Sequence, residues 1–324
     1  MKYLSRRKFL KLISCTVVIF LFSQQLFGSE KEVSVKTYTY KKVGDLEIKA
    51  DVYRLNDSII RPVAVWIHGG ALINGHREEL DEIVNQKLLE AGYAIVSVDY
   101  RLAPETKLPS IIEDIEDVFE WIYKKGPDLF QVDTSKIAVV GGSAGGYLAL
   151  LSGFRVKPRP TVLVAFYGYG DLIGDWFSQP SEHHINDMTK QKAWEQLNES
   201  QISDSRDRKG DGRGFYRYCR KHGIWPKVVS GWDSFTEAEN FFEYMPLKNI
   251  TPDFPPTILI HGTNDTDVPY EQSLMMAKEF EKHNVEHKLI TIPDAEHGLK
   301  DGDPELINAA YNSAFEFINQ FMKN

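Results

Sequence analysis

The order of hydrophobic and polar positions predicts alternating strands and helices from residue 33 to the end of the chain. Period-two alternation in VSVKTYTYKK and LEIKADVYR predicts two antiparallel strands within 33–53, joined at Gly44-Asp45. Continuous apolar runs, typical of strands buried on both faces, lie at 62–68, 93–100, 136–141, 161–168, 256–262 and 286–293. Apolar positions at helical spacing predict helices at 78–92, 110–126, 144–154, 270–283 and 304–323, the first two ending at Gly92 and Gly126.

This alternation predicts the α/β fold class, with a mostly parallel central sheet and helices on both of its faces. Residues 169–255 interrupt the rhythm with a polar stretch that carries four of the six tryptophans. Two adjacent parallel strands do not need a connection of this length. We therefore expect one domain at 29–324, in which about 169–255 form an insertion that caps the end of the sheet.

The first 28 residues have the composition of an export signal. They carry five basic and no acidic residues, and the apolar run from about Leu12 to Phe22 is short for a membrane span. SRRKFLK, residues 5–11, resembles the twin-arginine signal, with Arg6 and Arg7 as the paired arginines. An ordinary secretion signal is the alternative. Either signal predicts a periplasmic or extracellular protein that meets a membrane only during export.

Removal of this segment would change the formal net charge from −8 to −13. An acidic protein binds nucleic acid poorly, so we expect no nucleic-acid partner. Only Cys219 would remain of the two cysteines, which excludes an intramolecular disulfide in the mature chain.

GGSAG, residues 141–145, matches G-x-S-x-G between a predicted strand and a predicted helix. In that context a serine sits on a turn too tight for large neighbours, with its hydroxyl exposed at a helix N-terminus. Ser143 is therefore the candidate nucleophile. A plain tight turn is the alternative interpretation.

A serine nucleophile needs a base, and the base needs an orienting acid. Asp265 follows one predicted strand and His297 follows the next, so the chain order is Ser, Asp, His, as in hydrolases with this elbow. Asp267 is the rival acid. We expect His261 to be a packed, hydrogen-bonded histidine at a strand end, and His183-His184 to be surface residues without a third metal ligand.

HGGALING, DYRLAPE, GGSAGG, HGTNDTDVP and AEHG together resemble the α/β-hydrolase superfamily, over about 45–165 and 245–320. The chain is most similar to the branch that contains esterases and lipases like hormone-sensitive lipase, and bacterial carbohydrate esterases. The resemblance implies oxyanion donors at the backbone of Gly70, Ala71 and Ala144, although many members have a third glycine at Ala71. Gly142 stands where many lipase-like members have Asp or Glu, which favours the carbohydrate-esterase and formamidase-like members.

These motifs predict a serine esterase that cleaves short acyl groups, such as acetyl groups on carbohydrates or other small alcohols, through a Ser-His-Asp triad and an acyl-enzyme. That chemistry requires no cofactor and no metal. A peptidase or amidase with the same triad is one alternative, and an inactive binding module is another. The aromatic residues of the insertion either form its own small core or face the cleft.

Overall fold

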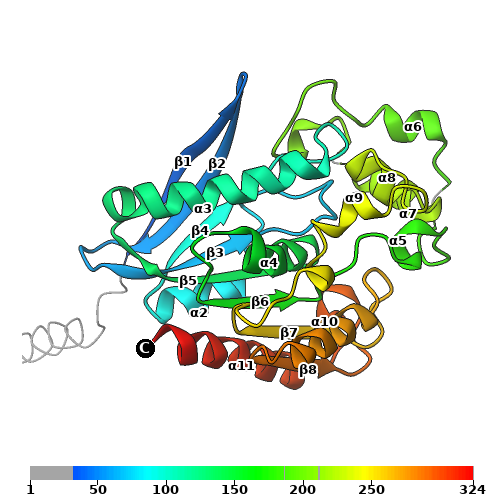
Figure 1. Cartoon of the computed structure of the whole chain (residues 1–324). Helices are drawn as coiled ribbons and strands as arrows, with labels where there is room; N and C mark the ends of the chain where they lie inside the picture. Colours follow the sequence, from blue (N-terminus) through cyan, green and yellow to red (C-terminus); the bar gives the residue numbers. More distant parts are fainter. Residues whose placement is uncertain (1–31, 186, 211, 324) are drawn as a thin grey trace, which may run out of the picture. The chain divides into compact units, whose positions relative to one another are not determined.

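A single eight-stranded sheet runs through the computed structural model, which describes residues 32–185, 187–210 and 212–323 (Figure 1). Its strand order is β1-β2-β4-β3-β5-β6-β7-β8, and residues 34–324 group into one compact unit. The expected export signal, 1–28, lies outside the described residues. The strands are β1 (Val33–Val43), β2 (Leu46–Leu55), β3 (Arg61–Ile67), β4 (Ala94–Val98), β5 (Val132–Gly142), β6 (Val162–Phe166), β7 (Thr257–Gly262) and β8 (His287–Ile292).

The central strands are parallel, as predicted for continuous apolar runs. β4, β3, β5, β6, β7 and β8 pair in parallel, and β2 joins β4 antiparallel, with Ala50 opposite Val98. The predicted turn at Gly44-Asp45 lies between β1 and β2. Parallel strands with buried faces bring their carboxyl ends to one edge, and ligand sites of open α/β sheets form there.

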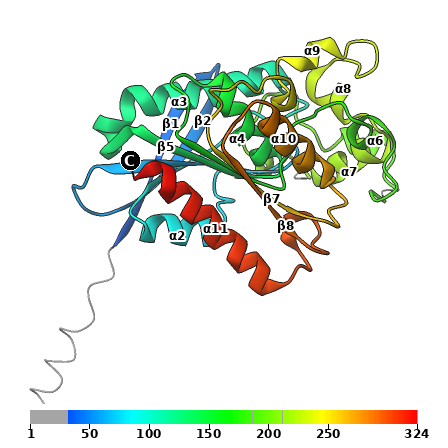
Figure 2. The same ribbon diagram turned by 60° about the horizontal axis from the view of Figure 1, so that its bottom comes forward.

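Helices cover both faces of the sheet, and Figure 2 shows them as two layers. Val63, Val65 and Ile67 of β3 pack in one buried cluster with α3 (Leu108–Phe130), α4 (Ala144–Arg155) and α10 (Glu271–Lys282). Ala64 and Trp66 point to the other face, where α2 (Glu82–Glu90) and α11 (Pro304–Met322) cover them. Because side chains alternate along a strand, one apolar run supplies both layers. The predicted fold class, an α/β-hydrolase sheet with helices on both faces, is confirmed.

Two helix boundaries differ from the prediction. The α2 helix begins at Glu82 because the Asp81 side chain accepts a hydrogen bond of 2.9 Å from the Val84 N–H, which is a helix N-cap. The α3 helix does not end at Gly126 but continues through Pro127 to Phe130. A Cβ on Gly126 would lie 3.0 Å from the Val132 side chain, so this glycine permits close packing instead of ending the helix.

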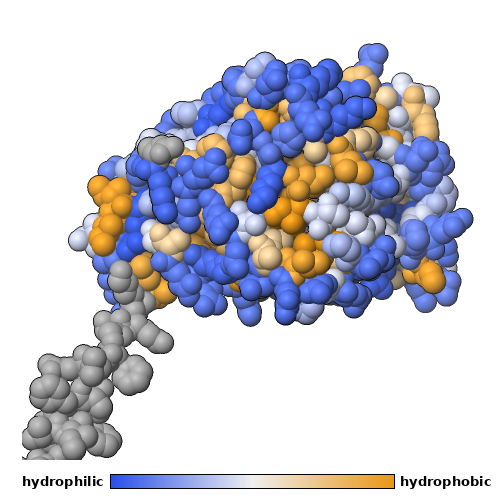
Figure 3. All heavy atoms as spheres, turned by 90° about the horizontal axis from the view of Figure 1, so that it is seen from below, coloured by the Kyte–Doolittle hydropathy of each residue, from blue (hydrophilic) through white to orange (hydrophobic). Residues whose placement is uncertain are grey.

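The outer side of the α2 and α11 layer is amphipathic. Seen from below, apolar residues gather near the middle of this face and polar residues surround them (Figure 3). Ala310, Ala314 and Ile318 of α11 are buried against the sheet, whereas Leu306 near its start is exposed. No helix within the described ranges combines the length and apolar character that crossing a bilayer requires.

Residues 167–256 connect β6 to the adjacent parallel strand β7. Figures 1 and 2 both show its helices gathered beyond one end of the sheet. They are short, and they bury Phe177, Phe215 and Trp225 in the same cluster as α3 and α4. The elements are α5 (Asp175–Ser178), α6 (Lys190–Trp194), η1 (Ser205–Asp207), α7 (Arg213–Lys221), α8 (Trp225–Ser230), α9 (Glu239–Phe242) and η2 (Pro246–Lys248).

Candidate active site

Ser143 occupies the one-residue junction between β5 and α4. Its backbone has φ 57° and ψ −123°, which is rare for a residue with a side chain. The turn leaves no room beside it: a Cβ on Gly145 would lie 2.0 Å from the carbonyl oxygen of Ile67. The glycines around Ser143 therefore serve close packing of the elbow against β3, and the serine stands at the N-terminus of α4.

The structure brings Ser143 together with the two other predicted site residues. His297, in the short helix η3 (His297–Leu299) after β8, has its Nε2 3.1 Å from Ser143 Oγ. Its Nδ1 lies 2.7 Å from Oδ2 of Asp265, which follows β7. The serine hydroxyl, imidazole and carboxylate thus form one continuous hydrogen-bonded chain.

Backbone and side-chain donors hold the Asp265 carboxylate in place. Its Oδ1 accepts hydrogen bonds from the N–H groups of Asp267 and Val268, at 2.9 and 2.8 Å. Burial raises the pKa of Asp265, but hydrogen bonds from His261 and His297 outweigh burial and bring the pKa below its ordinary value. Asp265 is therefore ionised and fixed, with Oδ2 directed at the imidazole.

His261 supports this carboxylate from inside the core. It is fully buried, with Nε2 2.9 Å from the carbonyl oxygen of Val268 and 3.3 Å from Asp265 Oδ2. Its Nδ1 lies 2.7 Å from Ser273 Oγ. The prediction of a packed, hydrogen-bonded histidine is confirmed.

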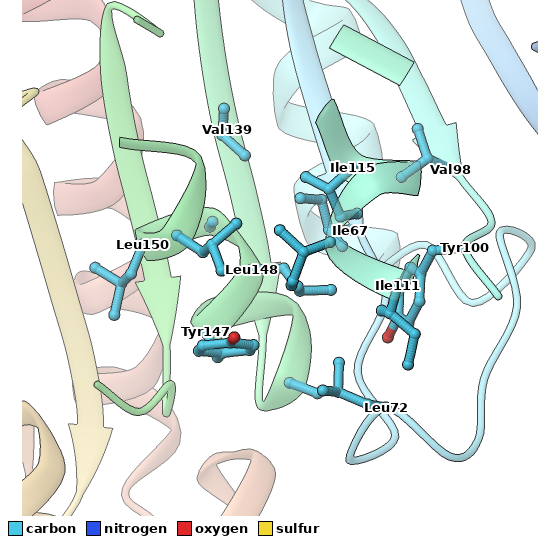
Figure 4. Close-up of a cluster of buried hydrophobic side chains, with 14 of the residues drawn as sticks. Ile67, Leu72, Val98, Tyr100, Ile111, Ile115, Val139, Tyr147, Leu148 and Leu150 are labelled. Carbon is cyan, nitrogen blue, oxygen red and sulfur yellow. The ribbon is translucent and has the colours of Figure 1, made fainter. Parts of the chain in front are cut away.

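The loop after β3 lies directly against the serine. A Cβ on Gly69 would lie 3.3 Å from Ser143 Cβ, and Gly70 and Ala71 have φ of 102° and 57°. Within the described residues, the N–H groups of Gly70, Ala71 and Ala144 donate no hydrogen bond. Leu72, which follows Ala71, is buried among side chains of the core cluster (Figure 4). Among the described residues, the loop after β3 and the N-terminus of α4 thus carry three backbone donors without a partner, on the two segments that flank Ser143.

Family models and solved structures of other proteins match most of this chain. The family model described as BD-FAE matches residues 51–198, and that of the prolyl oligopeptidase family matches 215–324. A Staphylococcus aureus protein of unknown function, 22% identical, covers 89% of this chain and 99% of its own at a TM-score of 0.70. A propionate-bound esterase of Thermogutta terrifontis, also 22% identical, covers 88% and 94% at 0.60.

The chain belongs to the α/β-hydrolase superfamily. Esterases are among its structural neighbours, and one of its two family models is that of a peptidase family. The non-reducing polyketide synthase Preu3 of Preussia isomera is 26% identical over 321 residues. That alignment covers 83% of this hydrolase but only 13% of the synthase, so the chain spans a small part of that relative's length.

The insertion of this α/β-hydrolase binds the loop after β3 through several polar contacts. The buried indole of Trp225 donates from Nε1 to the carbonyl oxygen of Ala71 at 2.9 Å. Ser205 Oγ accepts from the Gly75 N–H at 3.1 Å. Arg208 donates to the carbonyl oxygens of Ile73 and Ala103. The insertion is thus part of the wall that shapes this loop.

Asp267, the rival acid, lies on the opposite side of the imidazole from Asp265. It does not contact Nδ1, and its Oδ2 lies 3.6 Å from His297 Nε2, the nitrogen that faces Ser143. His184 of the insertion lies 2.9 Å from Asp267 Oδ1 through its Nε2, with 12% of its side chain exposed. The surface interpretation of His183-His184 is therefore wrong for His184, because Asp267 draws it inward, while His183 is exposed.

A hollow of about 620 Å³ lies beside the hydrogen-bonded chain. Asp265 and Arg220 reach its wall, whereas Ser143 and His297 do not line it. The lining contains the aromatic side chain of Trp176. The other lining side chains are mainly polar and come from the segment after β6 and the loops after β7 and β8: Asp175, Gln179, Glu182, His183, Thr263, Asn264, Thr266 and Glu296. Of the aromatic residues in the insertion, Phe215 and Trp225 join the core, whereas Trp176 is half-buried, packs against that core and also lines the hollow.

The sequence offered Tyr216 and Trp225 among the aromatic residues of the insertion of which one or two could face the cleft, but it revealed neither their contacts nor Arg220. Tyr216 and Arg220 lie on the amphipathic helix α7, but their partner Asp267 is far away in the chain, as Ala71 is from Trp225. The dense basic and aromatic run RGFYRYCRK was the available signal. No group of three side chains suited to a metal ion occurs among the described residues.

Proposed function

We propose that this α/β-hydrolase is an exported serine esterase that hydrolyses esters of short acyl groups, including acetyl esters of carbohydrates. The observation that carries the proposal is the chain Ser143 Oγ–His297 Nε2–His297 Nδ1–Asp265 Oδ2, with distances of 3.1 and 2.7 Å at its two hydrogen bonds. This is the arrangement in which a neutral imidazole can take the serine proton while a carboxylate stabilises the resulting imidazolium.

In the proposed reaction, Ser143 Oγ attacks the ester carbonyl and His297 Nε2 accepts the serine proton. The backbone N–H groups of Gly70, Ala71 and Ala144 donate to the carbonyl oxygen as it becomes an oxyanion. Nε2 then returns the proton to the leaving alcohol oxygen. Water, deprotonated by the same imidazole, attacks the acyl-serine. The bond to Ser143 Oγ then breaks, Oγ takes the proton back from Nε2, and the carboxylic acid leaves. Atoms and charge balance without a metal or cofactor.

Two observations favour a short acyl group and a polar alcohol. The structurally similar Thermogutta esterase has been solved with propionate, a three-carbon acid. The hollow beside Asp265 is lined by one tryptophan and many carboxylate, amide and hydroxyl groups, which suits a hydroxylated alcohol better than a lipid chain.

A fluorophosphonate probe tests the nucleophile directly. The wild-type protein should be labelled on Ser143, and Ser143→Ala should lose both the label and ester hydrolysis by several orders of magnitude, since triad members act as a unit. Activity within about tenfold of the parent would remove Ser143 from the mechanism. An unlabelled wild-type protein would favour a binding module.

The prolyl oligopeptidase match over 215–324 keeps a peptidase as the second candidate. The bond that is cleaved, ester or amide, separates the two. A series of p-nitrophenyl esters from acetate to decanoate, assayed beside acetylated polysaccharides and dipeptide p-nitroanilides, should give the highest kcat/KM with the shortest esters. Turnover of the anilides above the esters would make the protein a peptidase.

Export is proposed from the segment 1–28 and is tested on the full chain. Arg6→Lys with Arg7→Lys should retain the precursor in the cytoplasm, as the twin-arginine route reads the arginine pair. Unchanged export would instead favour the general secretory route.

A further inference from the structure

The two oxygens of the Asp267 carboxylate have different surroundings. Oδ1 takes part in three close polar contacts: with Tyr216 Oη at 2.5 Å, Arg220 Nη1 at 2.7 Å and His184 Nε2 at 2.9 Å. All three partners belong to the insertion. Because all three contacts are made by Oδ1, they fix the rotation of the Asp267 carboxylate.

Oδ2 is left on the reactive side of the site. It lies 3.6 Å from His297 Nε2, and Nε2 lies 3.1 Å from Ser143 Oγ. Within the described residues Oδ2 has no hydrogen-bond donor at bonding distance, and 24% of the Asp267 side chain is exposed. An open acceptor therefore stands beside the atom that must deliver a proton to the leaving alcohol.

The surroundings prevent this oxygen from turning away. Arg220 is 2% exposed, and its guanidinium lies over the rings of Phe177 and Trp176, at 4.9 and 5.3 Å from their centroids. Burial raises the pKa of Asp267, but contacts with His184, His297, Arg220 and Tyr216 outweigh burial and hold the pKa well below the ordinary range. The carboxylate is thus ionised, and it can only accept hydrogen bonds.

A purely structural ion pair does not explain this arrangement. Pairing with Arg220 uses Oδ1 and ties the insertion to the loop after β7, yet it gives no reason for Oδ2 to face the reaction centre. Orienting the imidazole is the task of Asp265 at Nδ1. The negative charge of Asp267 also raises the pKa of His297, but that effect does not require an unpaired oxygen, which leaves Oδ2 available for contact with the substrate.

We propose that Asp267 Oδ2 accepts a hydrogen bond from a hydroxyl group next to the esterified oxygen, so that the preferred substrate is a monoester of a vicinal diol, as in a partly acylated sugar. The inference rests on the proposed esterase function and specifies its alcohol. Two oxygens on adjacent ring carbons are about one hydrogen-bond length apart. When one receives the proton from Nε2, the other is therefore within reach of Oδ2. The hollow at Asp265 and Arg220 provides space for the rest of the alcohol.

A matched pair of acetates tests this inference without acyl or ring differences: trans-2-hydroxycyclohexyl acetate and trans-2-methoxycyclohexyl acetate. The wild-type enzyme should hydrolyse the hydroxy ester with a kcat/KM about tenfold to a hundredfold higher, because a hydrogen bond to a carboxylate is a strong one. A ratio near one for the wild-type enzyme would overturn the inference, whatever any variant does.

The variant Asp267→Asn should bring this ratio close to one. The donors from Tyr216, Arg220 and His184 would hold the amide oxygen at the Oδ1 position, which places the NH₂ group where Oδ2 was. That group donates to a hydroxyl and to a methoxy oxygen alike. Retention of the wild-type ratio in a folded Asp267→Asn protein would also overturn the inference.

One control shares the chemistry but keeps Oδ2. Asp175→Asn removes an exposed carboxylate on the hollow and should keep the preference for the hydroxy ester. Loss of the preference in Asp175→Asn would show that the neighbouring hydroxyl of the substrate contacts the hollow and not Asp267 Oδ2, which would overturn the inference. If the wild-type enzyme cleaves p-nitrophenyl acetate through Ser143 without the preference, the proposed function stands and this inference fails. Failure of fluorophosphonate labelling would remove the proposed function itself.

Discussion

The indole Nε1 of Trp225 donates a hydrogen bond of 2.9 Å to the carbonyl oxygen of Ala71, so a buried tryptophan of the insertion holds a residue of the loop after β3. Ala71 has φ 57° and is followed by Leu72 with φ 60°, two successive residues in a region that side chains disfavour. Such a conformation persists only where neighbours enforce it. Trp225 is one of those neighbours, and the planar packing of its ring on Phe177, with centroids 3.8 Å apart, fixes the indole.

Trp225→Phe should therefore weaken catalysis through the predicted oxyanion donors. We expect kcat to fall about tenfold with KM little changed, a smaller effect than the roughly hundredfold or greater loss from removing a donor outright. Steady-state kinetics on p-nitrophenyl acetate measure this split. Trp232→Phe is the matched control, because Trp232 packs on Phe241 and Tyr244 elsewhere in the insertion. A fall in Tm with unchanged kcat would leave Trp225 a packing residue only.

Asp265→Asn should be far more damaging than Asp267→Asn. An amide at position 265 no longer stabilises the imidazolium and favours the wrong tautomer of His297, which costs about three to four orders of magnitude in kcat. Asp267 does not contact Nδ1, so its replacement should cost less than about tenfold on p-nitrophenyl acetate. The opposite ranking in parallel kcat measurements would assign the orienting role to Asp267.

Much of this site could be predicted because its parts follow strands directly. Ser143, Asp265 and His297 each come just after an apolar run, and parallel strands bring such loops to one edge of the sheet. The glycines at 141 and 145 also carry a local signal, since a turn this tight excludes side chains. Local sequence therefore contained both the fold class and the positions of these three residues.

The contacts of the insertion could not be predicted in the same way. Arg220 and Asp267 are 47 residues apart. Most helices between β6 and β7 are too short to show a periodicity, and the amphipathic pattern of α7 does not indicate which distant residues its side chains contact. Their arrangement depends on packing and charge pairing between distant segments. His184 illustrates the consequence: in the sequence it is one of two adjacent polar histidines, and only the position of Asp267 determines which one turns inward.

The charge of Asp267 also predicts a pH effect. Burial lowers the pKa of His297, but the hydrogen bond with Asp265 and the charges of Asp267 and Asp265 raise it above the ordinary value. The base must be neutral, so kcat/KM should fall as the pH drops through this raised pKa. Asp267→Asn removes a negative charge 3.6 Å from Nε2 and destabilises the imidazolium. The acid limb of the kcat/KM profile should then move to lower pH. An acid limb at the same pH as in the wild-type enzyme, or at a higher pH, would contradict this prediction.

The last prediction concerns the buried ion pair between Arg208 of the insertion and Glu105. Their side chains are 0% and 2% exposed, with Arg208 Nη2 2.6 Å from Glu105 Oε2. The guanidinium also donates to the carbonyl oxygens of Ile73 and Ala103, so it joins the insertion to two loops of the sheet. Arg208→Met would leave a buried carboxylate without its cation.

We expect Arg208→Met to lower the free energy of unfolding by about 3–5 kcal/mol, as when one partner of a buried pair is removed. Urea unfolding measures the loss. Adding Glu105→Leu should recover much of it, because the uncompensated charge disappears. Arg206→Met is the control two residues away: Arg206 pairs with Glu78 at the surface, with side chains 49% and 46% exposed, and should cost less than about 1 kcal/mol. Equal losses for Arg206→Met and Arg208→Met would show that burial does not set the strength of the Arg208 contact, and that the insertion is held to the sheet by its apolar side chains instead.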